Sequence, residues 1–165
     1  MSHVFTAVGL VLGLALAGAA DAQSLTLQGL GPGKTRTLAP ADFAKLPHQA
    51  LAVDIHGRTV RFEGVPMLEL LRAVDAPWGD TLTGKDLADV VLVTCHDGYR
   101  VAYSLGEIDP GTARGQVLVA DRADGAPLDA ASGPFRIVVQ DDARPARDAR
   151  MVEKIELIRL GLPAR

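Results

Sequence analysis

Hydrophobic and polar positions alternate with a period of two along several short segments of this chain. Residues 51–55 read LAVDI and residues 60–62 read VRF, with His56-Gly57 between them. Such alternation is typical of strands, and a His-Gly pair suits a two-residue hairpin turn, where the backbone needs a positive φ. The pattern therefore predicts a β-hairpin over residues 51–62.

The most strand-like segment runs from Asp89 to Cys95 and reads DVVLVTC. Its unbroken run of apolar and β-branched residues predicts a central strand buried on both faces. Asp97-Gly98 then predicts a type I′ turn, after which Tyr99 to Ser104 return antiparallel.

The remaining elements are short and are separated by Gly, Pro and Asp. At Ser104 to Glu107, a Ser-x-x-Glu pattern predicts a capping box at the start of a short helix. Apolar residues recurring at helical spacing predict a helix opening at Gly64-Val65-Pro66 and running to about Val74. We also expect a short helix at residues 40–46 and strands at residues 24–28, 116–120, 135–139 and 152–160. Many short strands with a few short helices make a mixed, β-rich α+β fold.

The N-terminal segment has the pattern of an export signal. Residues 8–20 read VGLVLGLALAGAA, which is shorter than the roughly 20 apolar residues that span a bilayer. Ala20-Asp21-Ala22 suits signal peptidase, so we expect cleavage after Ala22. This predicts a signal peptide at residues 1–22, a single domain at residues 23–165, and a periplasmic or secreted protein. An uncleaved anchor or a buried N-terminal helix is the alternative.

Composition narrows the classes of function. A net charge of −3 argues against nucleic-acid binding, which depends on Lys and Arg neutralising phosphates. No second apolar run is long enough for a membrane span. The single cysteine, Cys95, has no internal partner, so it is buried, pairs between chains or serves chemistry. We find no zinc spacing, serine nucleophile motif or phosphate-binding Gly-rich loop.

Four stretches, in order, resemble the oxidoreductase molybdopterin-binding domain of the sulfite oxidase family. They are residues 62–71 (FEGVPMLELL), residues 95–105 beginning CHDGY, residues 120–139 with DGAPL and GPFRIVV, and residues 144–157. The resemblance covers about residues 38–160, and the order and spacing of the stretches carry it. It implies a mixed, β-rich fold around a pterin-bound molybdenum, with two-electron chemistry on a small oxyanion or sulfoxide-like substrate.

The resemblance also implies roles for residues at the end of the 89–95 strand. Cys95 falls where the family has its metal-ligating cysteine, and a thiolate is a suitable soft ligand. His96 could donate to an oxyanion, and Tyr99 could line the pocket through its hydroxyl group. The alternatives are a buried, inert Cys95, a solvent-facing His96 and a Tyr99 that packs on the sheet.

Arginines gather in the closing loop. Arg147 and Arg150 fall where the family pattern has lysines, and Arg144 precedes them. Guanidinium groups hold phosphate in a bidentate way, so these three residues are candidates to bind the terminal phosphate of a pterin or another small anion. The alternative is a solvated loop that Asp141, Asp142 and Asp148 balance.

The chain also departs from the family pattern. Residues 23–46 lack a stretch rich in Asn, His and Arg, and the closing loop lacks the family's tryptophan and glycine. The leader has no twin arginine, although molybdopterin is inserted in the cytoplasm and such enzymes are normally exported folded.

Two hypotheses follow. The first is a molybdopterin-dependent oxidoreductase in which Cys95 borders an open pocket and the arginines face inward. The second is a cofactor-free periplasmic ligand-binding or protein-interaction module on the same scaffold, for which Cys95→Ser would leave folding unchanged. The sequence names neither a substrate nor an electron-transfer partner.

Overall fold

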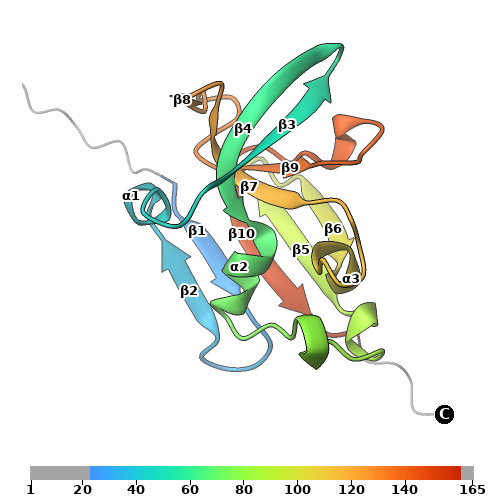
Figure 1. Cartoon of the computed structure of the whole chain (residues 1–165). Coiled ribbons are helices and arrows are strands. Elements are labelled where there is room, and N and C mark those ends of the chain that lie inside the picture. Colours follow the sequence, from blue (N-terminus) through green and yellow to red (C-terminus); the bar gives the residue numbers. More distant parts are fainter. Residues whose placement is uncertain (1–22, 161–165) are drawn as a thin grey trace, which may run out of the picture.

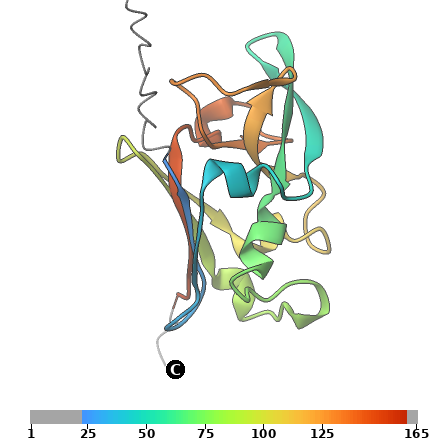
Figure 2. The ribbon, with the colours of Figure 1, turned by 90° about the vertical axis from the view of Figure 1, so that its left-hand side faces the viewer.

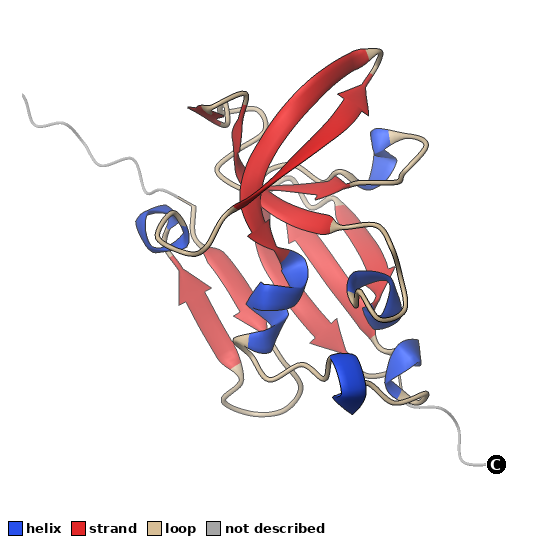
Figure 3. Ribbon diagram, in the orientation of Figure 1, coloured by secondary structure: helices blue, strands red, loops and turns tan. Residues whose placement is uncertain are grey.

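The computed structural model describes residues 23–160, so the expected signal peptide at residues 1–22 lies outside the described residues. The described chain forms ten strands, three short α-helices and three 3-10 turns (Figures 1 and 3). None of its helices has the length and apolar character needed to cross a membrane. The prediction of a mixed, β-rich α+β fold is confirmed at this level.

The first sheet has the strand order β2-β1-β10-β5-β6. The chain's first and last described strands lie side by side in it, because β1 pairs in parallel with β10, and every other pair is antiparallel. The strands are β1 (Leu25–Gln28), β2 (Thr35–Leu38), β5 (Val90–Cys95), β6 (Arg100–Ser104) and β10 (Val152–Ile158).

The second sheet is built around β7, which pairs antiparallel with β4, β8 and β9. The strands β3 and β4 form the predicted hairpin, with positive φ at both turn residues, His56 and Gly57. The strands are β3 (Gln49–Ile55), β4 (Arg58–Pro66), β7 (Val117–Ala123), β8 (Ala126–Pro127) and β9 (Arg136–Val139).

Short helices connect the strands. Figure 2 shows the first sheet nearly edge-on, with α1, α2 and the second sheet on the same side of it. The helices are α1 (Pro40–Phe43), α2 (Met67–Arg72) and α3 (Leu105–Ile108), and the 3-10 turns are η1 (Gly79–Thr81), η2 (Asp86–Ala88) and η3 (Pro145–Arg147). The predicted capping box is present, because the Ser104 hydroxyl accepts from the Glu107 amide and the Glu107 carboxylate accepts from the Ser104 amide.

The main core lies between the first sheet and the elements on that side. It includes the inward residues of β1, β5 and β10, the buried residues of α2, and Phe43 and Phe135. A second, smaller cluster lies on the other face of the second sheet and contains Leu51, Val53, Phe62, Leu118, Ala120 and Val138. Successive residues of β7 alternate between the two clusters, so β7 is covered on both faces.

Three local predictions are wrong. The strand β5 is buried on one face only, because its residues alternate between buried and half-exposed, and the strand covered on both faces is β7. The turn after Cys95 is not type I′, because the Cys95 carbonyl accepts from the Gly98 amide and only Gly98 within that turn has a positive φ. This places a tight turn one residue earlier, over Cys95 to Gly98.

The third error concerns residues 64–66, which continue β4 instead of opening the helix. Pro66 biases the residue before it toward extended backbone, so the segment stays a strand until Met67. At Gly64 the backbones of β4 and β7 approach so closely that a Cβ atom would lie 2.0 Å from the Val119 carbonyl oxygen. Glycine is therefore required where the register of this strand pair shifts.

Candidate functional site

Cys95 ends β5 and points into the main core, where only 1% of its surface is exposed. Burial, with smaller contributions from Asp97 and Glu153, raises the pKa of the thiol to about 11. A metal-ligating cysteine has the opposite surroundings, since neighbouring positive charges or a metal stabilise the thiolate. The described surroundings therefore favour a neutral thiol packed as a small apolar group.

His96 and Tyr99 lie in the exposed turn that follows Cys95. The Nδ1 atom of His96 is 3.5 Å from a carboxylate oxygen of Glu153. Tyr99 is 47% exposed, and its hydroxyl donates a 2.8 Å hydrogen bond to the Ala146 carbonyl. Tyr99 therefore ties the turn to the closing loop.

Arg147 is engaged by two carboxylates of the protein itself. Its Nη1 lies 2.6 Å from Glu107 Oε1, and its Nε and Nη2 donate to both oxygens of Asp142. The guanidinium also lies over the ring of Tyr103, and its hydrogen bonds to Asp142 and Glu107 raise the pKa of Arg147. Each guanidinium nitrogen of Arg147 thus already donates to a carboxylate, which fastens the closing loop to α3 and neutralises the charge that a phosphate would need.

Arg144 and Arg150 are exposed at the two ends of the segment that holds η3. The main cavities among the described residues are not lined by Cys95, His96, Tyr99 or the three candidate arginines. The described chain also brings together no group of three His, Cys, Asp or Glu side chains able to hold a metal ion.

These surroundings do not fit a thiolate-ligated molybdenum cofactor. The one thiol is buried and has carboxylates nearby, and the best-placed guanidinium is already neutralised. The roles of these residues in binding a cofactor stay predictions from the resemblance.

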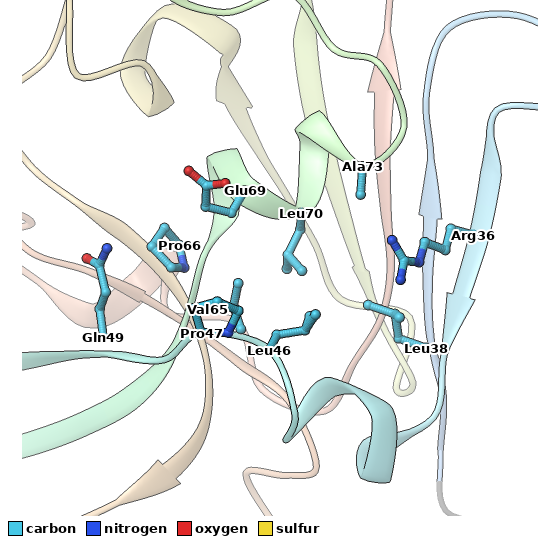
Figure 4. Close-up of a pocket in the computed structure, with 10 residues that line it drawn as sticks. All are labelled: Arg36, Leu38, Leu46, Pro47, Gln49, Val65, Pro66, Glu69, Leu70 and Ala73. Carbon is cyan, nitrogen blue, oxygen red and sulfur yellow. The ribbon is translucent and has the colours of Figure 1, made fainter.

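A different place in the fold has the shape of a ligand site. A cavity of about 380 Å³ opens between β2, the loop after α1, the end of β4 and α2. We call it the β2–α2 cavity (Figure 4), and its size lies within the range of small-molecule pockets. Its lining residues are Arg36, Leu38, Leu46, Pro47, Gln49, Val65, Pro66, Glu69, Leu70 and Ala73.

The floor of the β2–α2 cavity is apolar. Leu38, Val65 and Leu70 are at most 4% exposed, and each belongs to the main core. Their positions follow from the local structure, because Leu38 ends β2 and the helix α2 turns Leu70 inward. An apolar ligand surface placed here would be removed from water against a packed wall.

Polar groups stand at the rim. Arg36 comes from β2 and faces the cavity from one side, with Glu69 and Gln49 on the other (Figure 4). Glu69 already pairs with Arg72 at 3.0 Å, whereas Arg36 forms no ion pair with any described residue. The rim therefore offers one available guanidinium, which suits an anionic head group.

Sequence reasoning did not single out any residue of this cavity as a ligand-binding candidate. Its members come from four segments between residues 36 and 73, and most are ordinary core or loop residues. A local signal is Arg36, a charged residue two positions before Leu38, because alternate residues of a strand lie on the same face.

Comparison with known proteins gives a relation at the level of the fold. No family model matches the chain, and no curated protein matches it. Among solved structures, it is similar to the sulfane dehydrogenase SoxCD from Paracoccus pantotrophus, with a TM-score of 0.64 and 13% identity. The match covers 88% of this chain and 40% of that chain, so this chain spans well under half of that chain's length. The described residues thus share the fold of one part of a sulfane dehydrogenase.

Proposed function

We propose that this chain is a cofactor-free binding module on a sulfite-oxidase-like scaffold, and that it takes a small amphipathic anion in the β2–α2 cavity. One observation carries the proposal: the β2–α2 cavity has the size of a ligand site, an apolar floor and an available guanidinium. Neither Cys95 nor its neighbours line this cavity. The sequence resemblance and the fold similarity to a sulfane dehydrogenase both support the choice of scaffold.

The chemistry of the cavity decides the ligand class. The floor of Leu38, Val65 and Leu70 takes the apolar part, and Arg36 at the rim takes a carboxylate, sulfonate or phosphate. Burying about 150 Å² of apolar ligand surface would contribute about 4 kcal/mol before the cost of association. Together with one charged contact, this predicts binding in the micromolar to millimolar range.

The proposal includes export. The leader at residues 1–22 would direct an unfolded chain out of the cytoplasm, and residues 23–165 would form the mature domain in the periplasm or outside the cell. A module that needs no cytoplasmic cofactor insertion suits a leader without a twin arginine.

The binding proposal is tested with the fluorescent probe 1-anilinonaphthalene-8-sulfonate, which has an apolar body and one sulfonate. We expect one saturable site on the wild-type protein. Ala73→Trp, which fills the cavity from the exposed end of α2, should weaken binding at least tenfold, and Arg36→Gln should weaken it several-fold. The matched control is Ala102→Trp, at an exposed position on β6 at the opposite edge of the first sheet. Unchanged binding to Ala73→Trp would contradict the proposed site.

The similarity to a dehydrogenase motivates a second candidate, a molybdopterin-binding redox domain. Protein purified from its native cell envelope decides between the two. The cofactor-free proposal expects no stoichiometric molybdenum by elemental analysis and no pterin fluorescence after denaturation. Either signal at one equivalent per chain would overturn it and return Cys95 to the role of ligand.

A further inference from the structure

A buried cation lies away from the β2–α2 cavity. Arg136, in β9, is only 7% exposed, and its Nε is buried without a hydrogen-bond partner among the described residues. Its ion pair with Asp148 is long, with 3.6 Å between Nη2 and Oδ2. A buried guanidinium left with unpartnered N–H groups is costly, because it has lost its water without gaining full compensation.

The strand register explains why this cation lies where it does. Arg136 pairs with Ala120 of β7, and it shares a strand face with Val138, two residues along. Ala120 and Val138 belong to the smaller core cluster, so Arg136 projects on the face of the second sheet that is turned away from the main core. Its guanidinium lies 5.0 Å from the ring centre of Phe62 in the same cluster.

A cavity of about 320 Å³ opens beside this guanidinium. We call it the Arg136 cavity. Its apolar walls come from the β3–β4 hairpin, from β8 and from the loop after β8, and they include Ile55, Val60, Phe62, Pro127 and Leu128. Ser132 adds a hydroxyl group. The cavity shares no lining residue with the β2–α2 cavity.

Charges around the Arg136 cavity fall into two groups. At the rim, Arg58 and Asp124 neutralise each other at 2.6 Å, and Asp124 also accepts from the Arg61 amide at 3.0 Å. Asp129 lines the cavity from an exposed position, and its charge acts on Arg136.

Deeper in, Asp148 accepts from the Val139 amide at 3.2 Å, and burial raises the pKa of this carboxyl group. Arg150 adds a further positive charge near the guanidinium of Arg136. The inner carboxylate is thus directed partly to the backbone, which leaves the guanidinium incompletely paired.

We propose that the Arg136 cavity binds a short-chain aliphatic monocarboxylate. The carboxylate would take the N–H groups of Arg136 that Asp148 does not fill, and the chain would lie along Val60, Phe62 and Leu128. A planar guanidinium matches a carboxylate in a bidentate way, and the apolar walls exclude water from the pair. This site is separate from the one in the proposed function and does not depend on it.

The test is a titration of the isotope-labelled protein with hexanoate, followed by methyl and amide NMR. We expect saturable shifts at Ile55, Val60 and Leu128. Hexanol, which lacks the charge, and inorganic phosphate, which lacks the chain, should each bind at least tenfold more weakly. Equal shifts with hexanol, or shifts confined to the residues of the β2–α2 cavity, would overturn the proposal.

Two variants complete the test. Arg136→Met should weaken the hexanoate binding reported by Ile55, Val60 and Leu128 at least tenfold while leaving the hexanol response of these residues unchanged. Because that variant leaves Asp148 without its cation, Val60→Trp provides a second variant that fills the cavity and keeps the ion pair. Saturable hexanoate shifts at Ile55 and Leu128 that survive Val60→Trp in a folded protein would refute the site, and Ala102→Trp on β6 serves as the control.

Discussion

Replacing Cys95 with Ser should destabilise the protein, although the two side chains differ by one atom. The thiol is 1% exposed and faces the main core beside Val152, its strand partner on β10. The backbone groups of Cys95 are already used, because its amide donates to Tyr99 and its carbonyl accepts from Gly98. A serine hydroxyl here would be buried in apolar surroundings. Because the thiol is buried, we expect Cys95→Ser to destabilise the fold, contrary to the hypothesis from sequence that this substitution leaves folding unchanged.

The magnitude follows from the difference between a thiol and a hydroxyl group in the core. A buried hydroxyl without a good partner costs about 1–3 kcal/mol, so we expect Cys95→Ser to lower the free energy of unfolding by about 2 kcal/mol. Cys95→Ala removes the sulfur without adding a polar group and should cost about 1 kcal/mol. The order of stability should be wild type, then Ala, then Ser.

Urea unfolding followed by circular dichroism measures this order. With a slope of about 2 kcal/mol/M, the Ser variant should shift the midpoint of unfolding by about 1 M and the Ala variant by about half as much. A Ser variant as stable as wild type would refute the reasoning. It would mean that the thiol lies beside a polar space that water can enter, as a metal ligand would.

Three further outcomes are expected. Gly64→Ala should lower the free energy of unfolding by at least about 2 kcal/mol, because the new Cβ meets the Val119 carbonyl; Gly84→Ala, in open space, is its control for urea unfolding. Ser104→Ala should cost about 1 kcal/mol in the same assay through loss of the α3 cap, whereas Ser104→Asn, which keeps an acceptor, should cost less. Burial raises the pKa of Glu107, but hydrogen bonds from Arg147 and the Ser104 backbone outweigh it and hold that pKa below 4.5. The stability that Glu107 adds is therefore present above pH 4.5 and lost as pH falls through the lowered value, so melting temperatures of wild type and Glu107→Gln should converge toward pH 3.

A Gly84→Ala variant as unstable as Gly64→Ala would contradict the close-approach argument. Equal losses in Ser104→Ala and Ser104→Asn would contradict the capping argument. A constant difference in melting temperature from pH 7 to pH 3 would show that the ionised Glu107 carboxylate does not stabilise the fold.

The sequence predicted the elements whose signal is local. The alternation over residues 51–62 and the His56-Gly57 pair determine the β3–β4 hairpin within a few residues, and the Ser104 to Glu107 pattern begins α3 as expected. These features are stabilised by contacts between near neighbours in the chain. Propensity and periodicity report such contacts directly.

Elements defined by distant partners were missed or misread. The strand β2 carries little alternation, and it forms because residues 35–38 pair with β1. The apolar residues from Val65 to Val74 recur at helical spacing, yet pairing with β7 keeps residues 64–66 extended. The candidate site shows the same limit, since Arg36 and Leu70 meet only after β2 and α2 are placed by the sheets.

The reading of Cys95 shows why a motif does not establish chemistry. The sequence correctly placed this residue at the end of a strand, but it did not reveal that the strand turns the thiol inward. The direction in which the thiol points depends on which face of β5 meets the core. The run of apolar residues at positions 90–93 contains no polar residue that would mark the outer face.

The parallel pairing of β1 with β10 has a consequence for when the protein can fold. Residues 26–28 find their partners only at residues 154–156, and β10 also separates β1 from β5. A growing chain therefore cannot complete its first sheet until residues 152–158 have emerged. The first sheet thus depends on strands from both ends of the described region, and a product truncated before residue 152 would leave β1 and β5 without the strand that joins them.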